Sequence, residues 1–337
     1  MYLLELGGED DAFAAREAAS ACSDVQVRAR GVATARGATE RVRGLAYTHA
    51  ASELVGLAEG GVDAAVALLD AAAMDREGSV AVRARDVRGA TDVSTQRAER
   101  ELGRVLVERG FTVNLDDPDH ELRALFAASD EEETIAGVGW LTVESIRDFG
   151  DRRPTDKPFF QPGSMDPLLA RAVANVAGAR PGRTVLDPMC GTGGVLVEAG
   201  LVGADVVGTD AQWKMVHGAR ENLDRYLATG TDELPEPGEF TLARADATRL
   251  PLRDDAVEAV VFDAPYGRQS KVANRSLDAL VAEALAESYR VANRGVVVGD
   301  RAWDEAARDA GWTVTDRFVR RVHATLDRQV LVLAAEE

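Results

Sequence analysis

The chain is 337 residues long and 46% apolar, which is typical of a soluble globular protein with room for two or three domains. It has no run of 18 apolar residues and no basic segment followed by an apolar one at its start, so neither a membrane-spanning helix nor a signal peptide is expected. The net charge of −18 argues against nucleic acid as a partner, although in molar salt, where the Debye length is about 3 Å, long-range repulsion is weak.

The first 145 residues predict an α+β module, in which short strands mix with a few helices. Alternating apolar and polar residues predict strands over 1–6, 25–36, 79–87, 111–115, 120–129 and 134–144. Helical spacing of apolar residues predicts helices over 10–22, 50–59, 62–73 and 94–110. In the last of these, Ser94 is the expected N-cap and Gly110 the expected stop.

Residues 76–109 form a net-positive stretch, in which eight Arg stand against six Asp and Glu, a net charge of +2. Arg is suited to bidentate recognition of phosphate, so this stretch holds the candidate RNA contacts. They are Arg83, Arg85, Arg88, Arg97 and Arg104. A solvated Arg-rich face explains the same pattern, because only three of the 39 basic residues are Lys. This composition resembles that of proteins from salt-loving archaea.

A change of pattern separates the two halves of the chain. Residues 146–164 contain three Pro and many charges, which predicts a linker. From residue 165 onward, strand and helix patterns alternate, which predicts a mostly parallel, doubly wound sheet of the α/β class. Two final strands, 312–323 and 329–335, suggest an antiparallel edge to this sheet.

Four aspartates follow consecutive strands of the predicted sheet: Asp187, Asp210, Asp246 and Asp263. The first precedes a glycine-rich loop, in the stretch TVLDPMCGTGG, and glycines let a backbone approach a ligand closely. The loop matches neither GxGxxG nor a phosphate loop ending in GK[ST]. Because the carboxyl ends of parallel strands meet at one edge, the four acids predict a site for a nucleoside-type cofactor. A helix cap explains any one of them taken alone.

The two cysteines, Cys22 and Cys190, are far apart and belong to no Cys/His cluster. We therefore expect neither disulfides nor a metal site, and we expect a reducing, cytoplasmic location. Cys190 lies in the glycine-rich loop, where we expect a small buried side chain that fills space and not a nucleophile.

The order of these motifs resembles that of class I methyltransferases, which bind S-adenosylmethionine on a Rossmann-like sheet. The resemblance implies that Asp210 contacts the ribose and Asp246 the adenine, with the glycine-rich loop near the methionine part. The cofactor-binding residues that it implies are Asp187, Cys190, Gly191, Thr192, Gly193, Asp210, Ala211, Asp246, Ala247 and Asp263. The sequence DAPYG, 263–267, resembles the (D/N)PP(Y/F) motif of enzymes that methylate exocyclic amines of nucleobases, with Ala264 where the family usually has Pro.

The DAPYG motif has a physical rationale. The lone pair of an exocyclic guanine amine is delocalised into the ring, which makes the amine a poor nucleophile. Two acceptors, the carboxylate of Asp263 and the carbonyl of Ala264, can draw both N–H bonds and localise that lone pair. Pro265 would stiffen the turn and Tyr266 would stack on the base, a contact worth about 1–3 kcal/mol. Placement of the methyl donor then carries much of the rate, and no metal is required.

Three longer stretches, 157–178, 187–223 and 262–270, resemble the archaeal tRNA guanine-10 N2-methyltransferase family. That family makes N2-methyl- and N2,N2-dimethylguanosine, and it carries an N-terminal THUMP domain, an RNA-binding module preceded by a ferredoxin-like piece. The domains implied are a ferredoxin-like subdomain over 1–74, a THUMP domain over 75–145, a linker over 146–164 and a methyltransferase domain over 165–337.

The same resemblance implies tRNA as the partner. We expect a monomer by default, and no membrane partner because the chain has no long apolar run. Phe159, Phe160, Gly163 and Ser164 would edge the cofactor or base pocket, with Phe160 and Arg268 touching RNA. A hydrophobic anchor of the linker explains the two Phe equally well. Trp213 either covers the adenine or packs in the core. A C-terminal cluster either contacts RNA or lies by the active site; it consists of Arg317, Arg320, Arg321, His323 and Arg328. The alternatives are another guanine in tRNA or rRNA, an adenine N6 amine, and a non-enzymatic RNA-binding protein.

Overall fold

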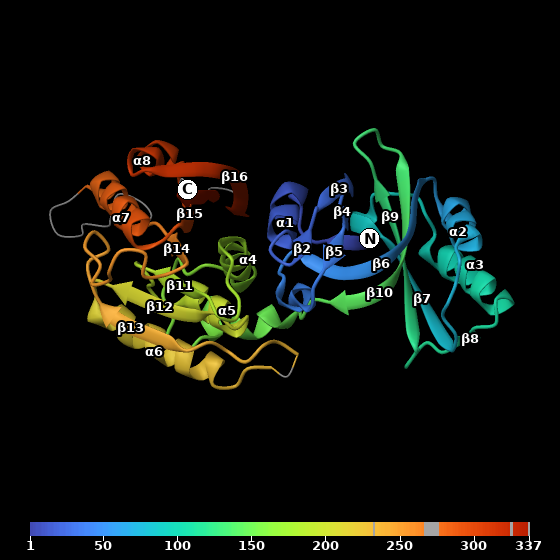
Figure 1. Ribbon diagram of the computed structural model, residues 1–337, viewed down its shortest axis with the longest axis horizontal. Helices are drawn as coiled ribbons and strands as arrows, with labels where there is room; N and C mark the ends of the chain where they lie inside the picture. Colours follow the sequence, from blue (N-terminus) through green and yellow to red (C-terminus); the bar gives the residue numbers. More distant parts are fainter. Residues whose placement is uncertain (232, 266–275, 324–325, 336–337) are drawn as a thin grey trace. The chain divides into compact units, whose positions relative to one another are not determined.

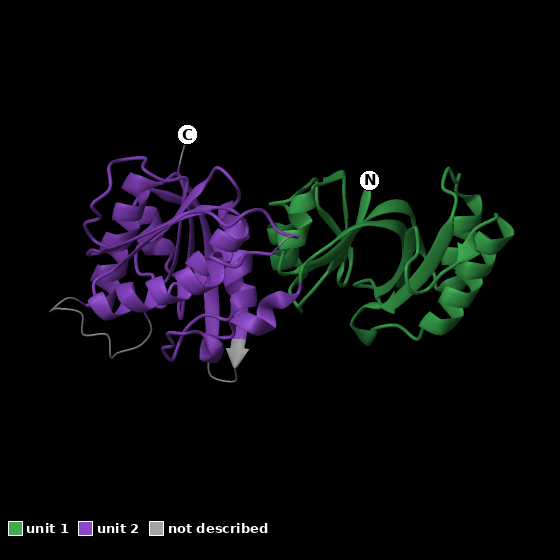
Figure 2. Ribbon diagram, turned by 90° about the horizontal axis from the view of Figure 1, so that it is seen from below, with its two compact units in different colours: residues 1–146 green, residues 147–337 purple. Residues whose placement is uncertain are grey.

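The computed structural model describes residues 1–231, 233–265, 276–323 and 326–335, which divide into two units, 1–146 and 147–337 (Figure 2). Within the described ranges, no helix combines the length and apolar character that crossing a membrane requires. Each unit is built on its own central sheet (Figure 1).

The first unit is an eight-stranded mixed sheet in the order β3-β4-β1-β6-β10-β9-β7-β8. Strand β7 runs parallel to β8 and to β9, and the other neighbours are antiparallel. The strands are β1 Tyr2–Leu6, β2 Cys22–Ser23, β3 Gln26–Ala29, β4 Val32–Ala35, β5 Gly37–Ala38, β6 Thr48–Glu59, β7 Ser79–Asp86, β8 Thr112–Val113, β9 His120–Ala128 and β10 Thr134–Glu144. The helices are α1 Asp11–Ala18, η1 Glu40–Gly44, α2 Val62–Ala71, η2 Val87–Gly89 and α3 Thr95–Glu108. Strands β2 and β5 pair separately.

Helix α3 shows how sequence pattern and packing agree in this unit. Its buried residues recur every three or four positions and pack with α2 over the strands of the sheet; they are Ala98, Leu102, Val105 and Leu106. The Ser94 side chain accepts a hydrogen bond from the backbone N–H of Arg97 at 3.3 Å, and Gly110 takes a left-handed φ of 96° after the helix. The predicted helix and its N-cap are confirmed.

Two predictions in this unit are wrong. Residues 50–59 were expected to be helical, but they belong to the central strand β6, which pairs with β1 on one side and β10 on the other. Alanine favours helices, and here tertiary pairing overrides that local preference. The single strand expected over 25–36 is instead the hairpin β3–β4, which turns at Gly31 with a φ of 77°.

The boundary predicted at residue 74 falls inside this continuous sheet. Strands from residues 1–74 and from residues 75–145 are joined by the long pairing of β6 with β10. The two predicted modules therefore share one sheet, and their assignment as ferredoxin-like and THUMP pieces stays a prediction.

The second unit is a seven-stranded sheet in the order β13-β12-β11-β14-β15-β17-β16. Strands β11 to β15 are parallel, while β17 is antiparallel to both of its neighbours, so the doubly wound sheet and its antiparallel edge are confirmed. The strands are β11 Thr184–Asp187, β12 Asp205–Asp210, β13 Phe240–Arg244, β14 Ala259–Asp263, β15 Arg294–Gly299, β16 Trp312–His323 and β17 Leu326–Ala335. The helices are η3 Asp148–Arg152, η4 Pro154–Asp156, α4 Pro167–Ala177, α5 Gly194–Leu201, α6 Trp213–Leu227, α7 Leu277–Val291 and α8 Asp304–Asp309.

A buried charge cluster joins the start of this unit to its core. Glu198 of α5 is fully buried, and its carboxylate accepts from Arg152 Nε at 2.7 Å and lies 2.8 Å from Arg171 Nη2. Arg152 also pairs with Asp148 at 2.7 Å. The Phe149 ring lies 5.6 Å from the Arg152 guanidinium and 5.4 Å from that of Arg171. Residues 148–152, from the stretch predicted to be a linker, are thus packed within the second unit.

Candidate active site

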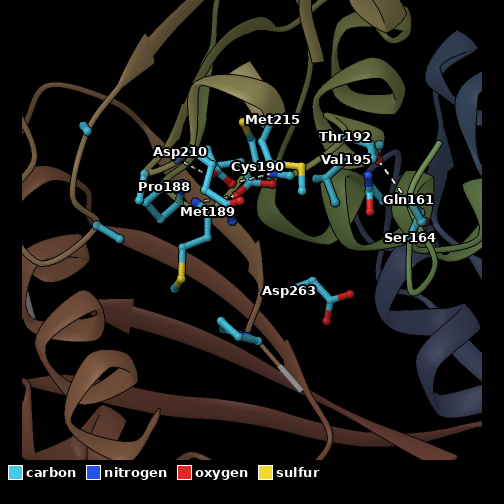
Figure 3. A pocket seen from close by; sticks show the side chains of 18 of the residues that line it. Gln161, Ser164, Pro188, Met189, Cys190, Thr192, Val195, Asp210, Met215 and Asp263 are labelled. Carbon is cyan, nitrogen blue, oxygen red and sulfur yellow. Dashed lines mark hydrogen bonds between the residues drawn. The ribbon is translucent and has the colours of Figure 1, made fainter. Parts of the chain in front are cut away.

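A pocket of about 1570 Å³ lies at the carboxyl ends of the parallel strands of the second unit (Figure 3). All four predicted aspartates line it, because the strands run in register and end at the same edge. The rest of its lining comes from the segment 161–165, from the loops after β11, β12, β13 and β14, from the end of β13 and from helices α5, α6 and α7. The structure therefore brings the predicted acids together, as expected of an open α/β sheet.

The glycine-rich loop after β11 turns tightly toward helix α5. Gly191 and Gly193 adopt left-handed φ values of 51° and 74°, and a Cβ on Gly193 would lie 3.2 Å from that of Ala219. The loop is tied to β12 by the backbone N–H of Cys190, which donates to the Thr209 carbonyl at 2.9 Å. Among the described residues other than its two chain neighbours, none has an atom within 4 Å of the position of a Cβ on Gly191, so a ligand can approach its backbone closely.

The strand-end carboxylates make the pocket acidic. Burial raises the pKa of Asp187 well above its usual range, and the charges of Asp263 and Asp210 raise it further. Burial also raises the pKa of Asp210, whose oxygens accept from the backbone N–H groups of Gln212 at 2.8 Å and Gly191 at 3.2 Å. Such a cluster favours a ligand that brings positive charge and hydrogen-bond donors.

Replacing Asp187 with Asn should stabilise the unliganded protein more at pH 8 than at pH 5. Because the folded state raises the pKa of Asp187, this group's contribution to stability is complete below about pH 4, its unfolded value, and is lost as the pH rises. An amide carries no such dependence, and its oxygen can still accept from the Met189 N–H, which lies 3.0 Å from Asp187 Oδ1. Unfolding temperatures of the wild-type and Asp187→Asn proteins at pH 5 and pH 8 measure this effect. A difference between the two proteins that is the same at both pH values would contradict the prediction.

The loop residues around these acids are held by burial and by hydrogen bonds within their turns. Burial raises the pKa of the Cys190 thiol well above its usual value, which keeps the sulfur neutral and fits the expected role as a space-filling side chain. Asp246 Oδ1 accepts from the backbone N–H and hydroxyl of Thr248 at 3.0 and 2.8 Å, which caps the turn after β13. Beside it, Ala247 is buried, and the Ala211 carbonyl accepts from Arg244 Nε at 2.9 Å.

The segment before α4 is attached to the glycine-rich loop through Asn222, a residue that the sequence did not single out. Its side chain exchanges hydrogen bonds of 2.9 Å with the backbone N–H and carbonyl of Phe159, and donates to the Thr192 carbonyl at 2.8 Å. The Ser164 and Thr192 hydroxyls lie 3.2 Å apart. The signal in the sequence was an Asn in the middle of the predicted helix. The side-chain amide of Asn222 is fully buried, and a buried amide requires hydrogen-bond partners.

The aromatic residues predicted at the site occupy different positions. Gly163 and Ser164 line the pocket, but Phe159 packs against Gly218 of α6, and Phe160 is 42% exposed without lining the described pocket. Trp213 lines the pocket and is 54% exposed, so it is not a core residue.

The DAPYG motif is described as far as residue 265. Asp263, Ala264 and Pro265 line the pocket, and the backbone N–H of Ala264 donates to the Val298 carbonyl at 2.7 Å. Arg328 Nη2 lies 3.4 Å from Asp263 Oδ2. Tyr266 and Arg268 lie outside the described residues, as does the side chain of His323.

The five arginines predicted to bind RNA all have acidic partners within the first unit. Arg85 pairs with Glu5, Arg88 with Asp11 at 2.5 Å, Arg97 with Asp63 at 2.6 Å, Arg104 with Glu108 at 2.6 Å, and Arg83 with Glu121 at 3.7 Å. The acids paired with Arg97 and Arg104 are exposed, and such ion pairs are worth about 0–1 kcal/mol, so a phosphate could replace these two acids at small cost. The acids paired with Arg83, Arg85 and Arg88 are only 5–19% exposed, so parting them from their arginines would cost more. Of the C-terminal cluster, Arg317 pairs with Asp304 of α8.

Comparison with known proteins gives both a family and named relatives. The family model described as UPF0020, RMKL-like, methyltransferase domain, matches residues 154–329. The tRNA (guanine(10)-N2)-dimethyltransferase of Methanothermobacter thermautotrophicus is 36% identical over 295 residues, which cover 86% of this chain and 83% of that protein. The protein of the same name from Pyrococcus abyssi is 30% identical over 244 residues, which cover 70% and 68%. The crystal structure of TrmN from Thermus thermophilus is 23% identical, covers 99% of both chains and has a TM-score of 0.49.

Proposed function

Because the chain belongs to the family of tRNA (guanine(10)-N2)-dimethyltransferases, we propose that it transfers methyl groups from S-adenosylmethionine to the N2 amine of guanine 10 in tRNA. The observation that carries this proposal is the position of Asp263, at the end of β14 and in one pocket with the other three strand-end acids. Two successive transfers would give N2,N2-dimethylguanosine. Acting on tRNA, the protein would work in the cytoplasm, and a monomer is the simplest form of it.

The residues of the pocket fit this cofactor. The open side of Gly191 leaves room for close approach of a ligand, and Asp210 lines the pocket, where its carboxylate would accept from a ribose hydroxyl. The acidic surroundings suit a cation, since Asp263 and Asp210 add to the effect of burial in raising the pKa of Asp187. When bound, S-adenosylmethionine supplies an electrophilic methyl group on a positively charged sulfur.

Asp263 and Ala264 are the residues that would act on the substrate amine. The carboxylate of Asp263 and the carbonyl of Ala264 would accept the two N–H bonds, which localises the nitrogen lone pair for attack. As the methyl group is added, Asp263 would take up the proton that the nitrogen releases. The hydrogen bond from the Ala264 N–H to the Val298 carbonyl holds the start of the turn, so the missing proline at 264 need not loosen it.

The first unit and the residues after Pro265 complete the proposal. We assign RNA binding to the first unit, in which the predicted arginines keep 26–55% of their side chains exposed. Tyr266 would stack on the guanine once this base has left its helix.

Incubation with labelled S-adenosylmethionine and unmodified tRNA transcripts in high salt tests the proposed function. We expect label in N2-methylguanosine first and in N2,N2-dimethylguanosine later, both at position 10. A transcript with adenosine at position 10 is the matched control and should remain unlabelled. Label in methyladenosine or at another guanine would contradict the assigned substrate, and cofactor binding without transfer would contradict the enzymatic activity.

A further inference from the structure

A buried arginine lies beside the carboxylate that the proposed mechanism uses. Arg328, near the start of β17, is 4% exposed, and its Nη2 lies 3.4 Å from Asp263 Oδ2. The same nitrogen donates a hydrogen bond to the Gly163 carbonyl at 3.3 Å. One guanidinium therefore touches both the strand end that carries Asp263 and the segment 161–165 on another side of the pocket.

The sheet topology explains how Arg328 reaches this place. Gln329 of β17 is opposite Gly299, the last residue of β15, and Val298 of β15 is opposite Asp263. Arg328 thus falls just beyond the end of β15, next to the end of β14. The antiparallel insertion of β17 between β15 and β16 is what brings a cation to the edge where the parallel strands end.

The burial of Arg328 indicates which role it can have. Burying a guanidinium costs free energy unless it is paired. The contacts with Asp263 and Gly163 offset part of this cost for Arg328. Because only 4% of the residue is exposed, an RNA phosphate cannot reach it as it could reach a surface arginine. Of the two roles considered for the C-terminal cluster, the structure gives Arg328 the one beside the active site.

We propose that Arg328 is a positioning residue for methyl transfer, which orients the Asp263 carboxylate through Oδ2 and fixes the Gly163 segment against it. This inference rests on the proposed role of Asp263. Arg328 is not among the residues that line the pocket, so it would act through the Asp263 carboxylate and the Gly163 segment. Its effect should therefore appear in the rate of transfer and not in binding.

Arg328→Met should lower kcat for tRNA methylation by about 100-fold, the order expected when a reacting group is misplaced by about 1 Å. The KM for tRNA and the Kd for S-adenosylhomocysteine, measured by calorimetry, should stay within about threefold of wild type. Arg328→Lys should restore about tenfold of the lost kcat, because an ammonium keeps the positive charge but lacks the fixed planar shape and the reach of the guanidinium. Asp263→Asn removes the negative charge that Arg328 would orient. Adding Arg328→Met to this variant should therefore lower kcat by less than about threefold.

Arg308→Met is the matched control, since Arg308 is an exposed arginine of α8 that pairs with Asp304 at 3.8 Å. It should leave kcat, KM and Kd unchanged. The inference is overturned if Arg328→Met keeps kcat near wild type, or if kcat, KM and Kd worsen together with a lower unfolding temperature, which is the sign of a merely structural role. If the wild-type protein binds S-adenosylhomocysteine but methylates no tRNA, the proposed function itself fails, and this inference fails with it.

Discussion

Asp263→Ala should lower kcat for methyl transfer by about 10³-fold or more while leaving the Kd for S-adenosylhomocysteine within about threefold of wild type. Removal of one preorganised electrostatic partner typically costs about 10²–10³-fold, and loss of a general base costs a similar factor. Asp263 supplies both effects in the proposed mechanism. Single-turnover methylation of a tRNA transcript measures the first quantity, and calorimetry measures the second.

The Ala variant also leaves Arg328 without its carboxylate, so a loss of stability has to be separated from a loss of chemistry. Asp263→Asn keeps the shape and one oxygen acceptor, and we expect an intermediate kcat with normal unfolding. Asp254→Ala is the control at the surface, since Asp254 is exposed and pairs with Arg290 at 2.7 Å. A fully active Asp263→Ala protein would contradict the mechanism.

Glu198→Ala should destabilise the second unit by about 3–5 kcal/mol, the cost of removing one partner from a buried ion pair. Its carboxylate is the shared acceptor of the Arg152 and Arg171 guanidinium groups, and all three side chains are at most 5% exposed. Asp148 would remain as the acid paired with Arg152. Since whole domains are stable by only about 5–15 kcal/mol, the loss is large. Urea unfolding followed by circular dichroism measures it.

Asp278→Ala is the matched comparison for this prediction, because the Asp278–Arg301 pair of 3.2 Å is exposed at both ends. It should cost less than about 1 kcal/mol, and the effect should shrink in molar salt, which screens surface charges. The Glu198 effect should persist in salt because the cluster is buried. Equal stability of the Glu198→Ala and Asp278→Ala proteins would contradict this prediction, because the buried ion pairs would then stabilise the protein no more than an exposed pair does.

The elements of the second unit and the four acids were predictable because their signals are local. A strand that ends in Asp and a helix that starts at glycines can both be seen within about ten residues, and parallel topology then brings the strand ends together. The partners of Asn222 and Arg328 were not predictable, although the place of Arg328 beside the active site was one of two roles expected for its cluster. Each acts on segments distant in sequence, with Arg328 and Gly163 separated by 165 positions.

The first unit shows the opposite limit, where local signals mislead. The sequence of residues 50–59 predicts a helix, but the segment forms part of β6. Pairing on both edges of the strand outweighs the intrinsic helix preference of its residues. The arginine stretch reads as a free basic surface, yet partners such as Glu5, Asp11 and Asp63 come from elsewhere in the fold. Counting charges within a window cannot include acids that only folding brings near.

The central place of β6 also governs how the chain can fold as it is made. This 12-residue strand acquires its second neighbour only when β10, residues 134–144, has left the ribosome. Until then one whole side of β6 displays unsatisfied backbone groups that can recruit a strand from another nascent chain. A product truncated near residue 74 lacks β10, so that edge of β6 stays unpaired. Early termination would therefore yield an aggregation-prone fragment and not a smaller folded domain.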